Sequence, residues 1–470
     1  MEGAPRSDSE VFTASSAKAG QTPIPDRPAG DTLPPDFPQF EILVNDNPSP
    51  GVLYISPFLR TTPRYSYLTI FDTDLNPVRY QRRTEANTDF KLHPNGRITF
   101  YDRTDLCFYA MDSSWTVTDT IRCGNGYPTD GHDIQYFPNG HILLMSYEDR
   151  IVDMSAIVPG GNPAAVVTGL VLEELDPAGA VVFEWRSWDH FAITDATHED
   201  LTAARIDYVH ANAFDIDTDG NILLSSRHLD EITKINRTTG AIMWRLGGRN
   251  NQFTFLNDSL RFSYQHDIRR LPNGNITLFD NGNYHVPPCS RAVEYHLDEP
   301  LMTAELVWEY RDTACISASA TGNVQRLPNG NTLISWGTEN LVTEVRPDGS
   351  KALEFRIPPA FATYRTFKFP LTSTSIASSP TVPLGPSLLP AYPNPFNNGA
   401  VISYVVRESG HVTIAVYNIV GRRVAVLLDG RVEAGEGSVQ FRPNDLSSGI
   451  YLVRMEGGGG SAMQKVVFIK

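Results

Sequence analysis

The sequence predicts an all-β chain, a six-bladed β-propeller followed by a small C-terminal β-sandwich domain. One observation is a Pro-Asn-Gly or Asp-Gly turn followed by alternating apolar residues, which recurs at 93–98, 137–142, 218–222, 271–276 and 327–333. The other is a second hairpin between successive turns, whose last strand ends in an aromatic residue. Two hairpins per unit, repeated six times, is typical of four-stranded blades that close into a ring.

The recurring turns are expected to join the two inner strands of each blade, because Asn-Gly and Asp-Gly favour the positive φ of two-residue hairpins. A degenerate sixth turn lies at 47–51. A seven-bladed ring is the nearest alternative, but no seventh hairpin is visible. The longest spacing between turns holds an insertion at 188–207, expected to be a helical or irregular loop on one rim. The outer hairpins lie at 67–80, 106–122, 172–185, 233–245, 294–309 and 344–355.

Composition divides the chain into four parts. Residues 1–40 are rich in Pro, Ser, Asp and Gly and are expected to be extended or disordered. Residues 41–368 contain the propeller repeats, and the Ser/Thr/Pro-rich residues 369–389 are typical of an extended linker. Residues 390–470 carry the alternating pattern of the small β-domain. Its expected strands lie at 401–406, 412–417, 424–428 and 450–455.

Charge and motif content exclude several classes of function. The 39 Lys+Arg against 54 Asp+Glu give a net charge of −15, which argues against a nucleic-acid-binding protein. No run of about 18 apolar residues is present, so no transmembrane segment is expected, and no Walker-type loop suggests a nucleotide. The segment Asp215 to Gly220 begins like a calcium loop, but Ser226 stands where an EF-hand needs Glu. It therefore predicts a turn, and neither metal nor cofactor is expected.

The four cysteines form two pairs that are close in sequence, Cys107 with Cys123 and Cys289 with Cys315. This arrangement suits two disulfides of an exported protein, and four buried thiols are the alternative.

The repeats can be aligned with one another, and this alignment points to a site. In a propeller the innermost strands line the central channel, so a fixed offset from each turn should reach the same depth. His210 shares a strand face with Asn212 because side chains alternate, and Arg227 lies on the neighbouring strand. We therefore expect three histidines and an arginine to converge, while Asp133 and Asp267 point away. The positions seven residues before each turn are Thr88, His132, Asn212, His266 and Gly322.

The arginine decides between the chemistries open to the three histidines. Neutral imidazole can be a nucleophile, a general acid or base, or a metal ligand. A guanidinium opposes a divalent cation but suits a tetrahedral oxyanion. The site therefore favours phosphate or sulfate ester chemistry. Two alternatives stay open: a non-catalytic cell-surface propeller that binds a ligand or partner, and a metal-dependent hydrolase or lyase that uses the histidines.

Four sequence blocks resemble bacterial arylsulfate sulfotransferases of the six-bladed propeller type: Gly131 to Ile134, Asp207 to Asn212, Ser225 to Arg227 and Tyr264 to Ile268. The resemblance implies transfer of a sulfuryl group from a phenolic sulfate donor to a phenol acceptor without a nucleotide. It implies that His266 becomes transiently sulfated, with His132, His210 and Arg227 as catalytic partners and Asn212 in support. Either His132 or His210 would be the general acid.

The last 80 or so residues resemble the C-terminal sorting domain of the type IX secretion system. The resemblance rests on the blocks 392–397, 417–422, 448–453 and 466–470. It implies the type IX machinery as a partner and a secreted or cell-surface location. A leader peptide would be needed for export. None is visible, so the N-terminus is expected to be incomplete.

Overall fold

The computed structural model separates the chain into two compact units, Met1–Ala377 and Ser378–Lys470. It describes residues 33–62, 64–370, 387–388 and, apart from short gaps, 391–470. Most of the expected N-terminal segment and linker, namely residues 1–32, 371–386 and 389, lies outside the described residues, as do Tyr392 and Pro393 of the first sorting block. The further gaps are 390, 398, 407–408, 420, 434, 444–445 and 458–459.

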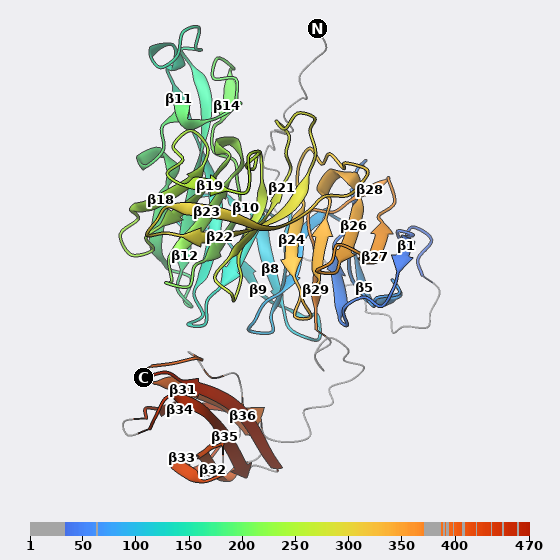
Figure 1. Cartoon of the computed structure of the whole chain (residues 1–470). Helices are drawn as coiled ribbons and strands as arrows, with labels where there is room; N and C mark the ends of the chain where they lie inside the picture. Colours follow the sequence, from blue (N-terminus) through green and yellow to red (C-terminus); the bar gives the residue numbers. More distant parts are fainter. Residues whose placement is uncertain are drawn as a thin grey trace. The chain divides into compact units, whose positions relative to one another are not determined.

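The first unit is a ring of six antiparallel blades, which confirms the predicted propeller (Figure 1). Each innermost strand contacts those of the two neighbouring blades, so the ring is closed. In ring order the innermost strands are β29 (Thr366–Phe369), β6 (Asn87–Leu92), β10 (Thr129–Tyr136), β15 (Ala211–Ile216), β20 (His266–Arg270) and β24 (Asn323–Arg326).

The remaining strands follow in the same blade order. The second strands are β2 (Val52–Ile55), β7 (Ile98–Asp102), β11 (Ile142–Val152), β16 (Ile222–Ser226), β21 (Ile276–Asp280) and β25 (Thr332–Ser335). The third are β4 (Ser66–Phe71), β8 (Cys107–Met111), β12 (Ala165–Leu175), β17 (Glu231–Ile235), β22 (Arg291–Asp298) and β26 (Leu341–Val345). The fourth are β5 (Pro77–Arg83), β9 (Val117–Ile121), β13 (Val181–Arg186), β18 (Ile242–Gly247), β23 (Thr303–Tyr310) and β27 (Lys351–Arg356).

Short elements extend some blades. The extra strands are β1 (Glu41–Asn45), β3 (Phe58–Leu59), β14 (Arg205–Asp207), β19 (Thr254–Leu256) and β28 (Phe361–Ala362). The 3-10 helices are η1 (Met154–Ala156), η2 (Ser187–Asp189), η3 (Ile193–Asp195), η4 (Arg227–Leu229) and η5 (Gly337–Glu339). No helix in the described part of the chain is both long and apolar enough to cross a lipid bilayer.

The core of the propeller lies between the blades. Six apolar clusters each join one pair of neighbouring blades, such as Leu143 with Leu224 and Leu246 with Leu278. Side chains alternate along each strand, so every blade presents apolar residues to both neighbours. Burial of both faces is the main term that favours the closed ring.

Both ends of the propeller sequence close the ring. Strand β29 pairs with β2 and supplies the innermost strand of the first blade, while β1 pairs with β27 at the outside of the last blade. The sequence interpretation was wrong here in two details. The turn at 47–51 leads from β1 to β2 and is not an inner hairpin turn, and Phe369, assigned to the linker, ends β29.

The long spacing between the second and third clear turns holds two features. Strands β11 and β12 form a hairpin that projects beyond the other blades (Figure 1). Residues 187–207 form the expected irregular segment, with η2, η3 and β14.

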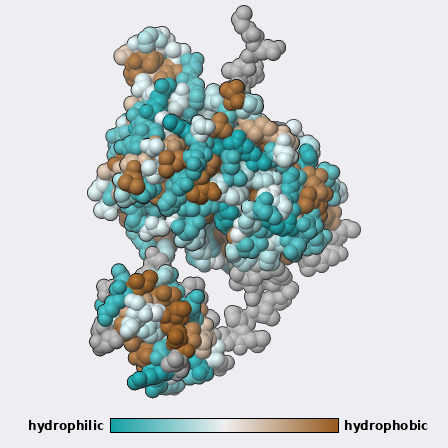
Figure 2. Space-filling model, in the orientation of Figure 1, coloured by the Kyte–Doolittle hydropathy of each residue, from teal (hydrophilic) through white to brown (hydrophobic). Residues whose placement is uncertain are grey.

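Most of the visible surface is hydrophilic, with apolar side chains in small groups that include the tip of the β11–β12 hairpin (Figure 2). Ile151 there is 78% exposed.

Six charged side chains from the innermost strands and the residue before β29 form one set of ion pairs, and all but Arg269 are buried. Arg365 is fully buried and bonds Asp89 at 3.0 Å, with Asp133 and Asp267 at 3.5 and 3.4 Å. Although burial acts to raise the pKa of Asp133, Arg269, Lys91 and Arg365 hold it far below its ordinary value. We call this set the axial charge cluster; its members are Asp89, Lys91, Asp133, Asp267, Arg269 and Arg365.

The second unit is a β-sandwich. One sheet has the order β30-β31-β34 and the other β33-β32-β35-β36, and the apolar core between them includes Ile402, Ile414 and Val453. All four predicted strands are present, whereas β34 and β36 were not predicted. The strands are β30 (Ser387–Leu388), β31 (Ala400–Val406), β32 (Gly410–Asn418), β33 (Arg423–Val432), β34 (Gly435–Phe441), β35 (Gly449–Gly457) and β36 (Gly460–Phe468).

Arg365→Met should destabilise the propeller strongly. The substitution leaves three buried carboxylates with only two cations, Lys91 and Arg269, and removing one partner from buried ion pairs costs about 3–5 kcal/mol. The matched control is Arg356→Met, because Arg356 is half exposed and pairs with Glu41 at 3.7 Å, an interaction worth less than about 1 kcal/mol. Urea unfolding followed by tryptophan fluorescence measures this, since all six tryptophans lie in the first unit. Equal losses in the two variants would contradict the role of the cluster.

Candidate active site

The innermost strands carry a β-bulge or another irregularity in pairing at a similar depth in four blades. A bulge inserts an extra residue and redirects the side chains beside it. The positions predicted to face the channel mouth, Thr88, His132, Asn212 and His266, lie within or at the edge of these irregular stretches. The register of pairing shifts between Thr88 and Lys91, Thr129 and Ile134, Ala211 and Ala213, and His266 and Arg269.

His132 and His210 lie side by side and share one arrangement. Their ring centroids are 5.3 Å apart and the rings are nearly perpendicular. Nδ1 of His132 is 2.5 Å from the carboxylate of Asp130, and Nδ1 of His210 is 2.7 Å from that of Asp207. Each carboxylate accepts the Nδ1 proton, so Nε2 is left for other partners.

His266 has a different environment. It is almost fully buried at the start of β20, and its Nδ1 is 2.7 Å from Oδ1 of Asn281. The backbone N–H of Thr321 donates to its Nε2 over 3.2 Å. Burial, followed by the nearby charge of Arg227, lowers the pKa of His266 well below its ordinary value. His266 is therefore a neutral imidazole near pH 7.

Arg227 is a cation without a carboxylate partner. One Nη is 2.7 Å from Nε2 of His228, the other donates to the Ser319 carbonyl over 3.0 Å, and the guanidinium lies 4.0 Å from the centroid of Tyr264. Its buried Nε–H has no hydrogen-bond acceptor. Among the residues that the structure describes, no ion pair neutralises Arg227. Such a guanidinium is suited to hold an anion.

The structure brings the predicted residues into one electrostatic group. The charges of Arg227, His210 and His132 each lower the pKa of His266. Asn212 connects two blades, because its Nδ2 donates to the carbonyl of Gln265 over 2.7 Å. Its buried Oδ1 has no hydrogen-bond partner. The arrangement places a neutral imidazole in one group with a guanidinium that has no ion-pair partner and two carboxylate-bound imidazoles.

Several residues of the site were missed in the sequence. Asp130 and Asp207 precede the histidines that they bind by two and three positions, and His228 follows Arg227 directly, so proximity in sequence could have indicated all three. Asn281 directly follows β21 in the blade of His266, Thr321 lies in the loop that leads to β24, and no repeat offset marks either residue. Burial lowers the pKa of His228 to about 3, so this imidazole is neutral.

At the group of Asp207, His210 and His228, metal binding is disfavoured by the hydrogen bonds of His228. Ligand atoms of Asp207, His210 and His228 lie within 4.8 Å of one another. However, Nδ1 of His228 faces the Asp207 carbonyl at 2.5 Å and its Nε2 accepts from Arg227. Neither nitrogen of His228 has a lone pair left for an ion. The calcium-like segment is also a turn, where Asp217 binds Lys234 and Arg270.

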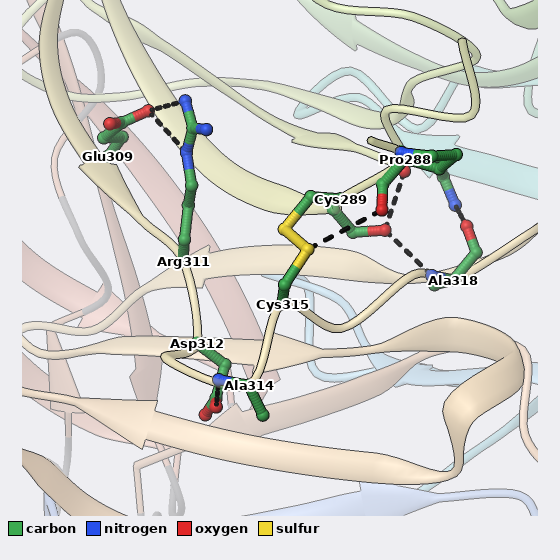
Figure 3. Close-up of a disulfide and its surroundings, with 10 residues drawn as sticks. Pro288, Cys289, Glu309, Arg311, Asp312, Ala314, Cys315 and Ala318 are labelled. Atoms are coloured by element: carbon green, nitrogen blue, oxygen red, sulfur yellow. Dashed lines mark hydrogen bonds and ion pairs between the residues drawn. A yellow bond between two sulfur atoms is a disulfide. The ribbon is translucent and has the colours of Figure 1, made fainter. Parts of the chain in front are cut away.

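A disulfide anchors the loop that carries Thr321. Cys289 and Cys315 are bonded, and Sγ of Cys315 lies 3.6 Å from the Pro288 carbonyl (Figure 3). Beside the disulfide, the N–H of Ala318 donates to Oγ of Ser290 over 2.9 Å. The segment that follows Cys315 supplies the backbone groups that contact Arg227 and His266.

The second expected disulfide is absent. Cys107 is buried on β8 and Cys123 follows β9, and both are free thiols. Burial raises the pKa of Cys107 to about 11, so the thiol is unreactive near neutral pH. The sulfur of Cys123 instead contacts the carbonyl of Met145 at 3.4 Å.

The fold and the site define a β-propeller in which three histidines lie together with an arginine that has no ion-pair partner among the described residues. Residues 49–357 match the model of the arylsulfotransferase (ASST) family. The chain belongs to this family and is an aryl-sulfate sulfotransferase, which implies aryl sulfate substrates. Residues 390–470 match the secretion system C-terminal sorting domain, which indicates export by the type IX machinery to the cell exterior or surface.

Solved structures with a similar arrangement share little sequence with the chain. A protein of unknown function from Bacteroides caccae is 13% identical, with a TM-score of 0.42, and the match covers 68% of this chain and 99% of that one. A streptogramin B lyase is 10% identical, with a TM-score of 0.37 and coverages of 68% and 87%. A virginiamycin B lyase from Staphylococcus aureus is 9% identical, with a TM-score of 0.35 and coverages of 71% and 89%. No curated protein matches the sequence.

Alkylation should find two free thiols. When the protein is denatured without reductant and treated with iodoacetamide, we expect adducts on Cys107 and Cys123 only, since Cys289 and Cys315 are bonded. Reduction before alkylation should raise the count to four. Peptide mass spectrometry locates the adducts. Modification of Cys289 or Cys315 without prior reduction would contradict the disulfide.

Proposed function

We propose that the protein moves a sulfuryl group from a phenolic sulfate ester to a phenol through a sulfated His266. The observation that carries this proposal is the unpaired Arg227 beside a neutral, buried imidazole. A sulfate monoester is a tetrahedral monoanion, and it supplies the charge that Arg227 lacks. Neutral His266 retains the lone pair that attack on sulfur requires.

The oxygens of the sulfuryl group would be held by donors that are fixed before the substrate binds. The free Nε–H of Arg227 can donate to one oxygen. When His132 or His210 is protonated on both nitrogens, its Nε2–H can donate to another oxygen while the carboxylate holds Nδ1. Sulfuryl transfer, like phosphoryl transfer, has a loose transition state, so positioning and charge stabilisation supply most of the catalysis.

The first step forms a bond from Nε2 of His266 to sulfur and breaks the bond from sulfur to the aryl oxygen. The leaving phenoxide takes a proton from the Nε2–H of His132 or His210. To attack, Nε2 must first lose the hydrogen bond that it accepts from the Thr321 N–H, and this hydrogen bond is long at 3.2 Å. In the second step an acceptor phenol returns a proton to the same imidazole and takes the sulfuryl group. No nucleotide donor is needed.

His266→Ala should abolish formation of the intermediate. Mixing the protein with an aryl sulfate and no acceptor should add the mass of one SO3 group and release one phenol. The matched control is His296→Ala, because His296 is an exposed histidine on β22 of the same blade. Intact mass and peptide mapping measure the adduct. If His266→Ala still forms it, the nucleophile is wrong. If wild type forms no adduct and releases no phenol, a non-catalytic binding propeller is favoured instead.

Arg227→Gln should slow adduct formation by at least ~100-fold, the usual effect of removing one preorganised donor to a developing anion. Arg227→Lys keeps the charge but not the planar donor set, so we expect an intermediate rate. Stopped-flow measurement of phenol release gives both rates. A Gln variant within threefold of wild type would contradict the role of Arg227.

A further inference from the structure

We propose that Asn281 is a positioning residue that keeps the proton of His266 on Nδ1 and leaves Nε2 as the nucleophile. This inference rests on the function proposed above, because it concerns the nucleophile of that reaction. Asn281 directly follows β21, and its side chain is fully buried.

The orientation of the Asn281 amide is fixed by two acceptors. Its Nδ2 donates to the carbonyls of Ala318 and Thr321, each over 3.1 Å. An amide nitrogen carries two hydrogens, so both are used. The atom that faces Nδ1 of His266 at 2.7 Å is therefore Oδ1, which can only accept. Hence Nδ1 carries the proton, and the lone pair lies on Nε2.

The bond from Thr321 supports this assignment independently. Its backbone N–H donates to Nε2 of His266, and a backbone N–H cannot accept. Nε2 must therefore be unprotonated. The loop that carries Ala318 and Thr321 follows Cys315, which is bonded to Cys289. The disulfide thus anchors the carbonyls that orient Asn281.

The choice of an amide distinguishes His266 from the other two histidines. Asp130 and Asp207 bind Nδ1 of His132 and His210 through negatively charged carboxylates. Asn281 orients the ring of His266 without supplying negative charge. The groups of positive charge that face His266 are Arg227, His210 and His132, and none of them favours its protonation. One site therefore holds two imidazoles bound by carboxylates and one bound by a neutral amide.

The amide also matters after the first step. When Nε2 has bonded to sulfur, the ring still carries the Nδ1 proton and is formally cationic, which makes it a good leaving group for the second step. The amide oxygen cannot remove that proton, whereas a carboxylate can. Asn281 thus suits both half-reactions: a lone pair on Nε2 before transfer and a protonated leaving group after it.

The test combines spectroscopy of the resting protein with kinetics. Long-range 1H–15N spectra of 15N-histidine-labelled full-length protein report the tautomer of His266, assigned by comparison with His266→Ala. We expect Nδ1–H and an unprotonated Nε2 that does not titrate between pH 6 and 8. An Nε2–H tautomer in wild type would overturn the proposal whatever the activity. An Nδ1–H tautomer in a protein that forms no adduct would contradict the proposed function but agree with the tautomer assignment.

Asn281→Asp is the most informative variant. It keeps an acceptor for Nδ1 but adds negative charge, so His266 should protonate and the adduct should form at least ~100-fold more slowly at pH 6, as for other misprotonated catalytic histidines. The rate should recover as pH rises, whereas the wild-type rate should show no such dependence on His266. A pH profile of adduct formation parallel to that of wild type would overturn the role of Asn281.

Asn283→Ala is the matched control. Asn283 lies two residues further along the same loop and its Nδ2 also donates to the neighbouring segment, at the Ser319 carbonyl over 3.1 Å, but it does not contact His266. We expect its rate within threefold of wild type and an unchanged tautomer. Asn281→Ala should lose both the fixed tautomer and the rate. Equal losses in the two alanine variants would reduce Asn281 to a structural role and overturn the proposal.

Discussion

The ion pairs of Arg365 are the constraint on which the propeller and its site depend. Three carboxylates from three different blades lie in the channel without access to water, and each would be costly there alone. Arg365 reaches all three and also donates to the carbonyl of Asn212 in a fourth blade. Because it directly precedes β29, the strand that closes the ring, closure and charge neutralisation happen together. Apolar contacts between blades favour a ring, and the axial charge cluster fixes how its inner ends meet.

The same cluster sets the direction of the catalytic side chains. Asp133 directly follows His132, and Asp267 directly follows His266. The pairing of β10 and of β20 is irregular at these residues, which lets adjacent side chains face different ways. At Asp267 the backbone takes a positive φ of 60°, which non-glycine residues seldom adopt. The sequence predicts that these carboxylates point away from the site. In the structure they point into the axial charge cluster, so the ion pairs hold the backbone in the shape that presents each imidazole.

The internal repeats determine how much of the fold and of the candidate site could be predicted from the sequence. His132 and His266 stand at one offset from an Asn-Gly turn, so an internal alignment locates them and the blades together. Arg365 lies beyond the last turn, and nothing local indicates that its strand returns to the first blade. Asn281 and Thr321 lie in loops of individual length, where no offset repeats. Closeness in sequence also fails to predict which cysteines pair. Cys107 and Cys123 are close in sequence but are free thiols, whereas the bonded Cys289 and Cys315 join two loops.

Net charge is a poor guide to this site, and the local partners explain why. The chain carries −15 overall, yet Arg227 has no carboxylate to neutralise it among the described residues. The acids around it are otherwise engaged: Asp207 binds His210, and Glu199 accepts the hydroxyl of Tyr264. Burial also raises the pKa of Glu199, which weakens its negative charge. In an acidic protein Arg227 thus has no ion-pair partner among the described residues, because each nearby carboxylate has a closer partner.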